Sequence, residues 1–544
     1  SEGMKLALDF GFSPTSWLTG NFTLDYVGNA AVKSLEEYYE KERSDNSIHL
    51  YDLDATIETE YFDLNAFYHV SRYHWQYKGD FFGLLWEATD LEGMDIWDAA
   101  APYGAEFVGK KGLLEGLTVV GGEEIYWGAN PKWIAKYTFG TENFEYTIMH
   151  SEDYDRAEKS SNDSSATQRE ERSTAVSVET TIFPGMTIQA GAIRTNPKKE
   201  DDMYDYLDGG RVKQDEIEFE DTLGYKLKVL KDDFDFGHAY FAAGYFGMVA
   251  DAGEPLREFD TLLPYSRYGN KYTLEAGVGI FRENSMIYPR IFYRDNLEDA
   301  NPLIEPTIVG TTLFPGIVPR NTEDDPFAVL DNRKALSAEI FYTYDPTPET
   351  DFYHWDNEHQ ENAPIAFNVG FNYTQFDSIT DAYRIYDGNL DIEYAFDTGL
   401  KKEDVWKIAS RVVLNPTKWV RLANRFEAAY QQSTGTPEGP TQEYYSWEFD
   451  YDFGLNHNVA GYVKKDAWGP YDYYRQWNVI FPLQVRLDYT YQLERMLNDW
   501  FQRKVGKNVQ IGITGIYRTL DDEQAEEDDN DHEYQITTFL SYGF

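Results

Sequence analysis

Apolar and polar residues alternate with a period of two along most of this chain, and this pattern constrains its fold more than any other feature. In residues 365–373 the odd positions are Ile, Phe, Val, Phe and Tyr, and the even positions are Ala, Asn, Gly and Asn. The same alternation occurs in residues 4–12, 51–61, 445–453 and 485–491. Successive side chains of a β-strand point to opposite faces. Each segment is therefore predicted to be a strand with one apolar and one hydrophilic face.

Noisier alternation fills much of the remaining chain, including residues 81–89 and 217–230. Short connections such as Ser13–Thr15, Phe183–Gly185, Asn415–Thr417 and Phe481–Leu483 separate some of these segments, and long polar stretches such as 28–47 and 295–333 separate others. Short turns at one end and long loops at the other are typical of transmembrane barrels. We expect one all-β domain over residues 1–544, a transmembrane antiparallel β-barrel of about 24 strands (roughly 22 to 26) without a plug domain.

The composition argues against a water-soluble protein of several domains. Aromatic residues make up 17% of the chain, yet they stand singly between polar residues instead of in long apolar runs. No stretch approaches the roughly 18 consecutive apolar residues that a transmembrane helix needs. Closed barrels cross membranes with only alternate residues apolar, so both observations favour a barrel.

Three connections share a small motif in which a proline is followed by a tryptophan that begins the next strand. They are Ser13–Trp17, Asn130–Trp133 and Asn415–Trp419. Aromatic side chains gather at membrane–water boundaries. We therefore expect Trp17, Trp133 and Trp419, with Tyr542 and Phe544 of the last strand, to lie at such boundaries, mostly on the side of the short turns.

Some parts of the pattern do not fit. If the turns at Pro14, Pro184, Pro416 and Pro482 all face one side, the number of predicted strands between them has the wrong parity. Residues 92–113 and 493–508 are the least strand-like. The first of these, which contains Ala99–Pro102, could be a loop folded into the lumen.

The last segment, Tyr534–Phe544, has apolar or aromatic residues at 534, 536, 540, 542 and 544. This pattern resembles the C-terminal strand signature of Gram-negative outer-membrane β-barrel proteins, which the outer-membrane assembly machinery reads. The resemblance covers the whole chain in pattern. It implies a location in the bacterial outer membrane and partners that include the lipid bilayer, lipopolysaccharide and that machinery.

Within this class the chain resembles porins. The first alternating strand starts at Met4, which argues against a plugged, energy-coupled transporter. The run Gly121–Gly128 is similar to alginate-export-type channels, although it is too short to assign a substrate. The function we expect is passage or export of solutes or of a polymer. The alternative is a structural barrel whose lumen or loops hold another protein.

Carboxylates are the most distinctive feature of the hydrophilic faces. If Leu53, Ile57 and Tyr61 face lipid, the carboxylates between them face the lumen or its rim. By this logic the candidates for lumen lining and selectivity are Asp52, Asp54, Glu58, Glu60, Asp391, Glu393, Glu448, Asp450 and Asp452. Rings of carboxylates favour cations, and the net charge of −47 agrees with a cation-preferring pore. However, Lys226, Lys228, Arg421, Arg425 and Arg486 also face inward by the same pattern, so these acids could simply solvate a mixed wall.

We expect no enzyme, no catalytic residue, no metal site and no cofactor. The chain has no cysteine, and His354–His359 has the wrong spacing for a zinc-protease motif. Residues 521–531 are strongly acidic without the pattern of a helix-loop-helix calcium site. Weak binding of divalent cations at such loops is an alternative to a plain solvated loop. The acidity makes a nucleic-acid partner unfavourable.

Overall fold

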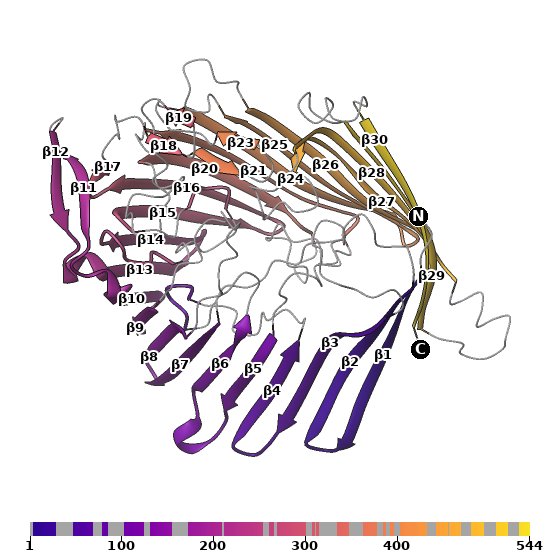
Figure 1. Cartoon of the computed structure of the whole chain (residues 1–544), viewed down its shortest axis with the longest axis horizontal. Coiled ribbons are helices and arrows are strands. Elements are labelled where there is room, and N and C mark those ends of the chain that lie inside the picture. The colour runs from indigo at the N-terminus through magenta and orange to yellow at the C-terminus, as the bar shows by residue number, and fades with distance from the viewer. Residues whose placement is uncertain are drawn as a thin grey trace.

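A single antiparallel sheet of 23 strands dominates the computed structural model. The structure describes residues 4–28, 47–68, 79–84, 103–124, 131–154, 172–208, 211–253, 261–265, 269–300, 307–309, 312–314, 334–346, 363–377, 384–387, 392–395, 403–431, 442–454, 456–468, 480–493, 507–519 and 532–543. The strands of this sheet follow one another in chain order, each paired with its predecessor. The sheet curls so that its two ends lie on the same side of the molecule (Figure 1).

The strands of the large sheet have 7 to 15 residues, and most reach the roughly 9–11 residues that a barrel strand needs to cross a bilayer. They are β1 (Met4–Thr15), β2 (Leu18–Gly28), β3 (Ser47–Glu58), β4 (Phe62–Tyr68), β5 (Tyr103–Gly109), β6 (Leu117–Glu124), β7 (Lys132–Thr141), β8 (Phe144–Asp153), β9 (Arg172–Phe183), β10 (Met186–Thr195), β13 (Leu223–Phe234), β14 (Gly237–Phe246), β15 (Lys271–Arg282), β16 (Ser285–Asn296), β20 (Ala335–Tyr344), β21 (Ile365–Phe376), β24 (Glu403–Thr417), β25 (Val420–Gln431), β26 (Gln442–Phe453), β27 (His457–Trp468), β28 (Ile480–Gln492), β29 (Lys507–Thr519) and β30 (His532–Gly543).

The strand number falls within the predicted range, and the all-β class is confirmed. Among the described strands, no pairing joins β1 to β30. Because 23 is odd and every neighbouring pair is antiparallel, these two edge strands run in the same direction.

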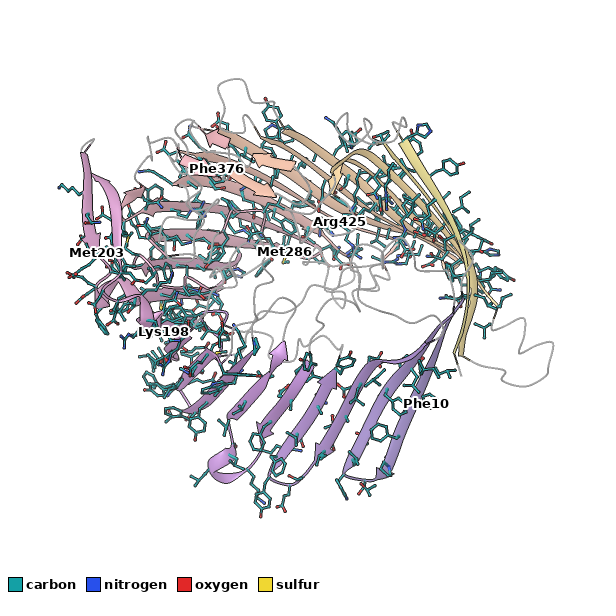
Figure 2. All side chains as sticks on the ribbon, viewed as in Figure 1. Phe10, Lys198, Met203, Met286, Phe376 and Arg425 are labelled. Carbon is teal, nitrogen blue, oxygen red and sulfur yellow. The ribbon has the colours of Figure 1, made fainter. Side chains whose placement is uncertain are left out.

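Burial along the strands is inverted relative to a water-soluble sheet. On β20, Ser337 and Glu339 are 1% and 4% exposed, whereas Leu336 and Ile340 on the other face are 56% and 50% exposed. We call the face with Glu339 the inner face, because further segments of the chain pack on it, and the opposite face the outer face. Side chains stand on both faces throughout the sheet (Figure 2).

Most short turns lie at one end of the sheet and most long connections at the other, although the β20–β21 connection (residues 345–364) and the β28–β29 connection (residues 493–506) are long and lie at the end with the short turns. The turns β1–β2, β3–β4, β9–β10, β13–β14, β15–β16 and β24–β25 are short and lie at one end. The sequence predicts a turn at Pro482, but this residue lies near the start of β28, where a proline is tolerated. Removing this supposed turn resolves the parity conflict, since Pro14, Pro184 and Pro416 then share one end.

The smaller elements lie in the long connections. A second sheet joins β11 (Met203–Asp208), β12 (Arg211–Glu216) and β17 (Asp299–Ala300), and it stands beyond the ends of the main strands (Figure 1). Two hairpins are β18 (Thr307–Val309) with β19 (Thr312–Phe314), and β22 (Arg384–Asp387) with β23 (Ile392–Ala395). Three 3₁₀ turns are η1 (Gly112–Leu114), η2 (Pro197–Lys199) and η3 (Phe219–Thr222). No helix in the described part of the chain is long and apolar enough to cross a membrane.

Two strand predictions were wrong. Of the predicted strand 81–89, residues 81–84 belong to segment 79–84, a loop that packs on the inner face. Residues 85–89 lie outside the described residues. Residues 217–230 are not one strand, because η3 precedes β13. In the weak segment 92–113, residues 103–109 form β5, while Ala99–Pro102 lie outside the described residues.

Candidate pore wall

The outer face presents a band of apolar side chains around the middle of the strands. Exposed members of this band are Val176, Leu227, Phe241, Leu274, Ile291, Ile340, Phe371, Ile408, Phe426, Leu487 and Ile513. Each lies several residues from both ends of its strand. Contiguous apolar surface on this scale is not stable against water and marks contact with a membrane or another protein.

Aromatic side chains flank this band at both ends. Exposed aromatics at the end with the short turns are Trp17, Tyr61, Phe139, Phe183, Phe234, Phe236, Trp419 and Phe453. At the end with the long connections they are Tyr154, Tyr225, Tyr245, Tyr373, Trp406 and Tyr445. An apolar band between two aromatic girdles is the arrangement of transmembrane barrels.

The predicted boundary aromatics divide between these two ends. Trp17 and Trp419 lie at the short turns and are exposed. Trp133 lies at the opposite end, because β7 begins at the end of the sheet where most long connections lie, and the centre of its ring is 4.9 Å from that of His150. The shared motif therefore does not mark one side of the molecule. Phe544 and the side chain of Tyr542 lie outside the described residues.

The predicted acidic stripe forms on β3, with one exception. Asp52, Asp54 and Glu58 point to the inner face, where Asn65 on β4 donates hydrogen bonds to Asp54 (3.0 Å) and to Thr56 (2.8 Å). Glu60 does not belong to this stripe. It lies in the β3–β4 turn and pairs with Lys111 of the β5–β6 turn.

Carboxylates of the neighbouring strands extend the stripe. Asp9 on β1 accepts a hydrogen bond from Thr23 on β2 (2.9 Å), and Thr23 is the register partner of Asp52. On β4, Asp63 lies opposite Glu58 and pairs with Lys110 at 2.7 Å. The inner face of β1–β4 is therefore an acidic wall, defined here by Asp9, Asp52, Asp54, Glu58 and Asp63.

The second predicted stripe is part of a mixed ladder. Glu448, Asp450 and Asp452 on β26 all face inward, but Glu448 forms an ion pair with Lys464 on β27 at 2.7 Å. The register of β26 places Glu448 opposite Arg425 and Asp452 opposite Arg421. Asn458 donates to both Asp450 and Asp452. Because cations lie beside Glu448 and Asp452, the net charge of this ladder is smaller than its carboxylates alone would give.

The third predicted pair is not part of the large sheet. Glu393 lies on β23, whose partner is β22 in a separate hairpin. Asp391 lies outside the described residues, as do His354–His359 and residues 521–531. In the part of the chain that the structure describes, no group of three or more acidic or histidine residues is placed to hold a metal ion.

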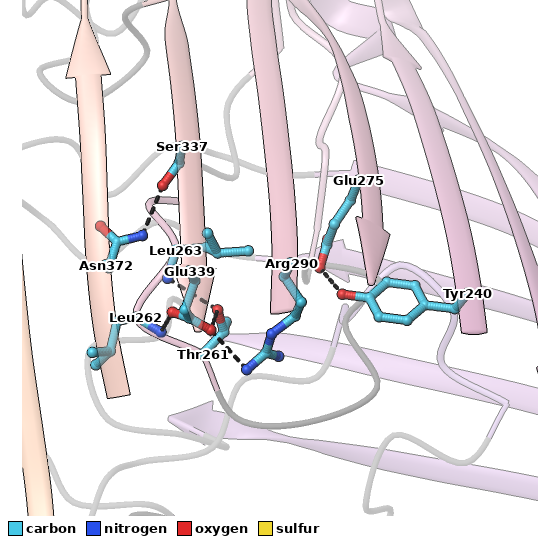
Figure 3. A network of polar contacts seen from close by, with 9 residues as sticks. All are labelled: Tyr240, Thr261, Leu262, Leu263, Glu275, Arg290, Ser337, Glu339 and Asn372. Carbon is cyan, nitrogen blue, oxygen red and sulfur yellow. Dashed lines mark hydrogen bonds and ion pairs between the residues drawn. The ribbon is translucent and has the colours of Figure 1, made fainter. Parts of the chain in front are cut away.

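A basic wall on β13–β16 is the main feature that the acidic-stripe interpretation missed. Lys226, Lys271, Arg290 and Arg294 face inward and are at most 4% exposed. Alternation placed Lys226 inward, but alternation does not show whether an inward side chain meets water or protein. Buried carboxylates lie among these cations. Glu339 pairs with Arg290 at 2.7 Å, and Glu275 accepts a hydrogen bond from Tyr240 (Figure 3).

Segments from two long connections cover this basic wall and the apolar inner surface beside it. Phe82 and Leu84 of segment 79–84, with Ala250 and Ala252 of segment 247–253, pack in one cluster with inner-face residues Phe67, Val120, Ile134, Met149, Ala175, Ile193 and Phe246. Leu262 of segment 261–265 donates its backbone N–H to Glu339 (Figure 3). Inward-folded segments are therefore present at residues 79–84, 247–253 and 261–265, while residues 92–102, where we expected such a loop, lie outside the described residues.

No protein-family model matches the chain, and no curated protein matches it. Solved structures to which it is similar are bacterial outer-membrane β-barrel proteins. OpdQ of Pseudomonas aeruginosa is 9% identical with a TM-score of 0.30, covering 100% of this chain and 97% of that chain. A BenF-like porin from Pseudomonas fluorescens is 9% identical with a TM-score of 0.29, covering 99% and 98%.

Wzi of Escherichia coli, titled an outer-membrane protein involved in group 1 capsule assembly and a carbohydrate-binding β-barrel, is 8% identical with a TM-score of 0.32. The match covers 80% of this chain and 81% of Wzi. TM-scores of this size are too low to transfer a strand number, a binding site or a solute from any of these proteins.

Proposed function

We propose that this chain is a channel of the bacterial outer membrane. The observation that carries the proposal is the inverted sheet, with an apolar band between two aromatic girdles on the outer face and polar, charged side chains on the inner face. In a bilayer every backbone polar group needs a partner, and a curled sheet of paired strands supplies these partners along its length. Strand numbers above 16 leave an aqueous interior unless it is filled.

The finer part of the proposal is a weak preference for cations. The acidic wall supports it, because Asp52 and Asp54 are only partly buried on the inner face. The basic wall is covered by protein, and the β25–β28 ladder is mixed. The preference should therefore be smaller than the net charge of −47 suggests.

Planar-bilayer recording tests both parts. Stepwise conductance with a reversal potential that favours K⁺ over Cl⁻ in a salt gradient is expected. A silent bilayer, with insertion shown separately by protease protection in vesicles, would remove the channel. A reversal potential favouring Cl⁻ would remove only the cation preference.

The partners follow from the same geometry and stay proposals. The outer face would contact the lipid bilayer, with lipopolysaccharide on the side of the long connections. The last strand, β30, would be read by the assembly machinery, and acidic loops would attract divalent cations. The alternative function, a barrel that holds another protein in its lumen or loops, predicts loss of conductance steps when that partner is bound.

A further inference from the structure

The basic wall is covered by side chains that interact with its cations individually. The ammonium of Lys226 lies 5.0 Å from the ring centre of Phe82, and it donates to the backbone carbonyl of Phe81 at 3.4 Å. The ammonium of Lys271 lies 5.6 Å from the ring centre of Tyr265. Ammonium groups are attracted to aromatic faces, more strongly where water is excluded. Segments 79–84 and 261–265 therefore each contact a wall cation directly.

A single carboxylate fastens segment 261–265 to the wall. Glu339 on β20 accepts hydrogen bonds from the hydroxyl of Thr261 (2.9 Å) and the N–H of Leu262, and it also pairs with Arg290 on β16 (Figure 3). The Glu339 and Arg290 side chains are 0% and 1% exposed. The buried Glu339 carboxylate thus pairs with one cation of the wall and also holds the segment that covers the wall.

Segment 247–253 is fastened at the other side of the basic wall. Thr195, at the end of β10, accepts the N–H of Asp251 at 3.2 Å, and Asn196 donates to the carbonyl of Val249 at 3.1 Å. Tyr265 donates to the carbonyl of Ala252 at 3.1 Å, which ties segments 247–253 and 261–265 together.

Glycine allows the segments to approach one another closely. Gly253 has φ +59°, and a Cβ there would lie 1.4 Å from the carbonyl oxygen of Phe82. On β10, beside the basic wall, a Cβ at Gly191 would lie 2.8 Å from the Phe82 ring. The packing of segment 79–84 against segment 247–253 therefore depends on Gly253, and its packing against β10 depends on Gly191.

The charges are divided unequally between the wall and its cover. The wall holds Lys226, Lys271, Arg290 and Arg294 with the carboxylates Glu275 and Glu339, whereas Asp80 and Asp251 belong to the covering segments. With the cover in place, Asp80 and Asp251 add two carboxylates beside the wall, and the ammonium groups of Lys226 and Lys271 are buried. Without it, the wall would present an excess of positive charge to the lumen.

We propose that segments 79–84, 247–253 and 261–265 form a lining that determines selectivity by hiding a strip of wall that would otherwise bind anions. This inference rests on the proposed channel function. The lining buries the cations of the basic wall and adds the carboxylates of Asp80 and Asp251 beside them, so that the acidic wall sets the preference of the pore. Inorganic anions and carboxylate solutes are the ligands that the uncovered strip would take.

Cysteine reactivity tests the covering itself, and the chain contains no cysteine that would interfere. Lys271→Cys, in protein inserted into vesicles, should resist a water-soluble methanethiosulfonate reagent. The matched control is Lys407→Cys, an exposed position on the inner side of β24, which should react at least tenfold faster. Equal rates at the two positions would overturn the proposal.

Gly253→Val tests the selectivity role, because the added side chain cannot coexist with the Phe82 carbonyl. The reactivity of Lys271→Cys should rise at least tenfold in this background, and the preference for K⁺ over Cl⁻ should fall. Adding Lys226→Met and Lys271→Met should restore the preference. The control is Gly454→Val, which also has positive φ (+70°) but no atom within 4 Å of the added Cβ, and it should change neither readout.

Two results would overturn the proposal even if Gly253→Val fails to assemble. The first concerns the parent channel. If Lys226→Met combined with Lys271→Met shifted its selectivity as much as Lys407→Met does, the covered cations would not be hidden from solutes. The second is unchanged Lys271→Cys reactivity in Gly191→Leu. If the bilayer stayed silent while Lys271→Cys resisted the methanethiosulfonate reagent, the channel function would be overturned, and with it the selectivity role. Failure of the proposed function can thus be distinguished from failure of the covering.

Discussion

The same alternation places the acidic wall on β1–β4 and the basic wall on β13–β16 on the inner face, but the charged side chains of the two walls differ in burial. On the acidic wall, Asp52 and Asp54 are half-buried and have neutral neighbours such as Asn65 and Thr23. On the basic wall, Lys271 and Arg294 are almost completely buried and are covered by other parts of the chain. In the proposed channel, an inward charge would therefore contribute to selectivity only where no segment covers it.

This difference also shows why the net charge is a poor guide to the pore. In the described ladder on β25–β28, cations lie beside Glu448 and Asp452, and on the basic wall Arg290 pairs with Glu339, while Glu275 and Asp251 are buried in the same region. Among the described residues of the acidic wall, Asp63 pairs with Lys110, whereas Asp9 and Asp54 accept hydrogen bonds from the neutral side chains of Thr23 and Asn65. The predictions below test this contrast, from the largest expected effect to the smallest.

Removing one carboxylate from each wall should give very different stability changes. Glu339→Ala leaves the buried Arg290 guanidinium without its ion-pair partner, so we expect a loss of about 3–5 kcal/mol in the free energy of unfolding. Asp54→Ala breaks a hydrogen bond in a half-buried site and should cost about 1 kcal/mol. Urea unfolding of protein folded into vesicles measures both. Equal losses would show that the two walls do not differ in burial.

Neutralising the acidic wall should change selectivity. With Asp9→Asn, Asp52→Asn and Asp54→Asn combined, the permeability ratio of K⁺ over Cl⁻ should fall towards one. A charge about 10 Å from an ion in water contributes roughly 0.4 kcal/mol, which is a factor of about two. Reversal potentials at low salt measure the change. Glu60→Gln is the matched control, because this acid lies in a turn and is paired with Lys111, and its effect should be negligible.

The preference of the parent channel should weaken as salt rises. The Debye length falls from about 10 Å at 0.1 M to about 3 Å at 1 M, so partly exposed carboxylates are screened. Reversal potentials at a fixed concentration ratio but different mean salt test this. A preference that is independent of salt would indicate that size or binding, rather than the acidic wall, sets selectivity.

The smallest effect is expected in the mixed ladder. Glu448→Gln removes one charge of an ion pair with Lys464, and several further cations and acids alternate around it. We expect a slight shift of the reversal potential towards anions, smaller than that of Asp54→Asn measured under identical conditions. A larger shift would mean that the ladder, not the acidic wall, is the selectivity element.

The strands could be predicted from sequence because strand geometry alone fixes the alternation. The segments at 365–373, 445–453 and 485–491 all lie in strands of the large sheet. Errors arose where apolar residues pack on the inner face of the sheet. Phe81, Phe82 and Leu84 are apolar because they pack on the inner face, and this mimics a lipid-facing strand.

The site was predictable only in part for a related reason. Alternation assigns a side chain to a face, so Asp52, Asp54 and Glu58 were placed correctly on the inner face. It carries no information about long-range packing. The cover over Lys226 comes from residues about 145 positions away in sequence, as the hydrogen bond to Phe81 shows. Glu393, on a hairpin outside the sheet, showed a strand pattern without being part of the wall.

Spin-label accessibility along β25 tests the central claim, that the outer face meets lipid and the inner face meets an aqueous lumen. Labels at residues 422–429, one at a time in protein inserted into vesicles, should alternate. Positions 422, 424, 426 and 428 should show high accessibility to oxygen, which partitions into lipid. Positions 423, 425, 427 and 429 should favour a water-soluble nickel chelate. Loss of this alternation, or the opposite phase, would contradict the inverted sheet on which the proposed channel depends.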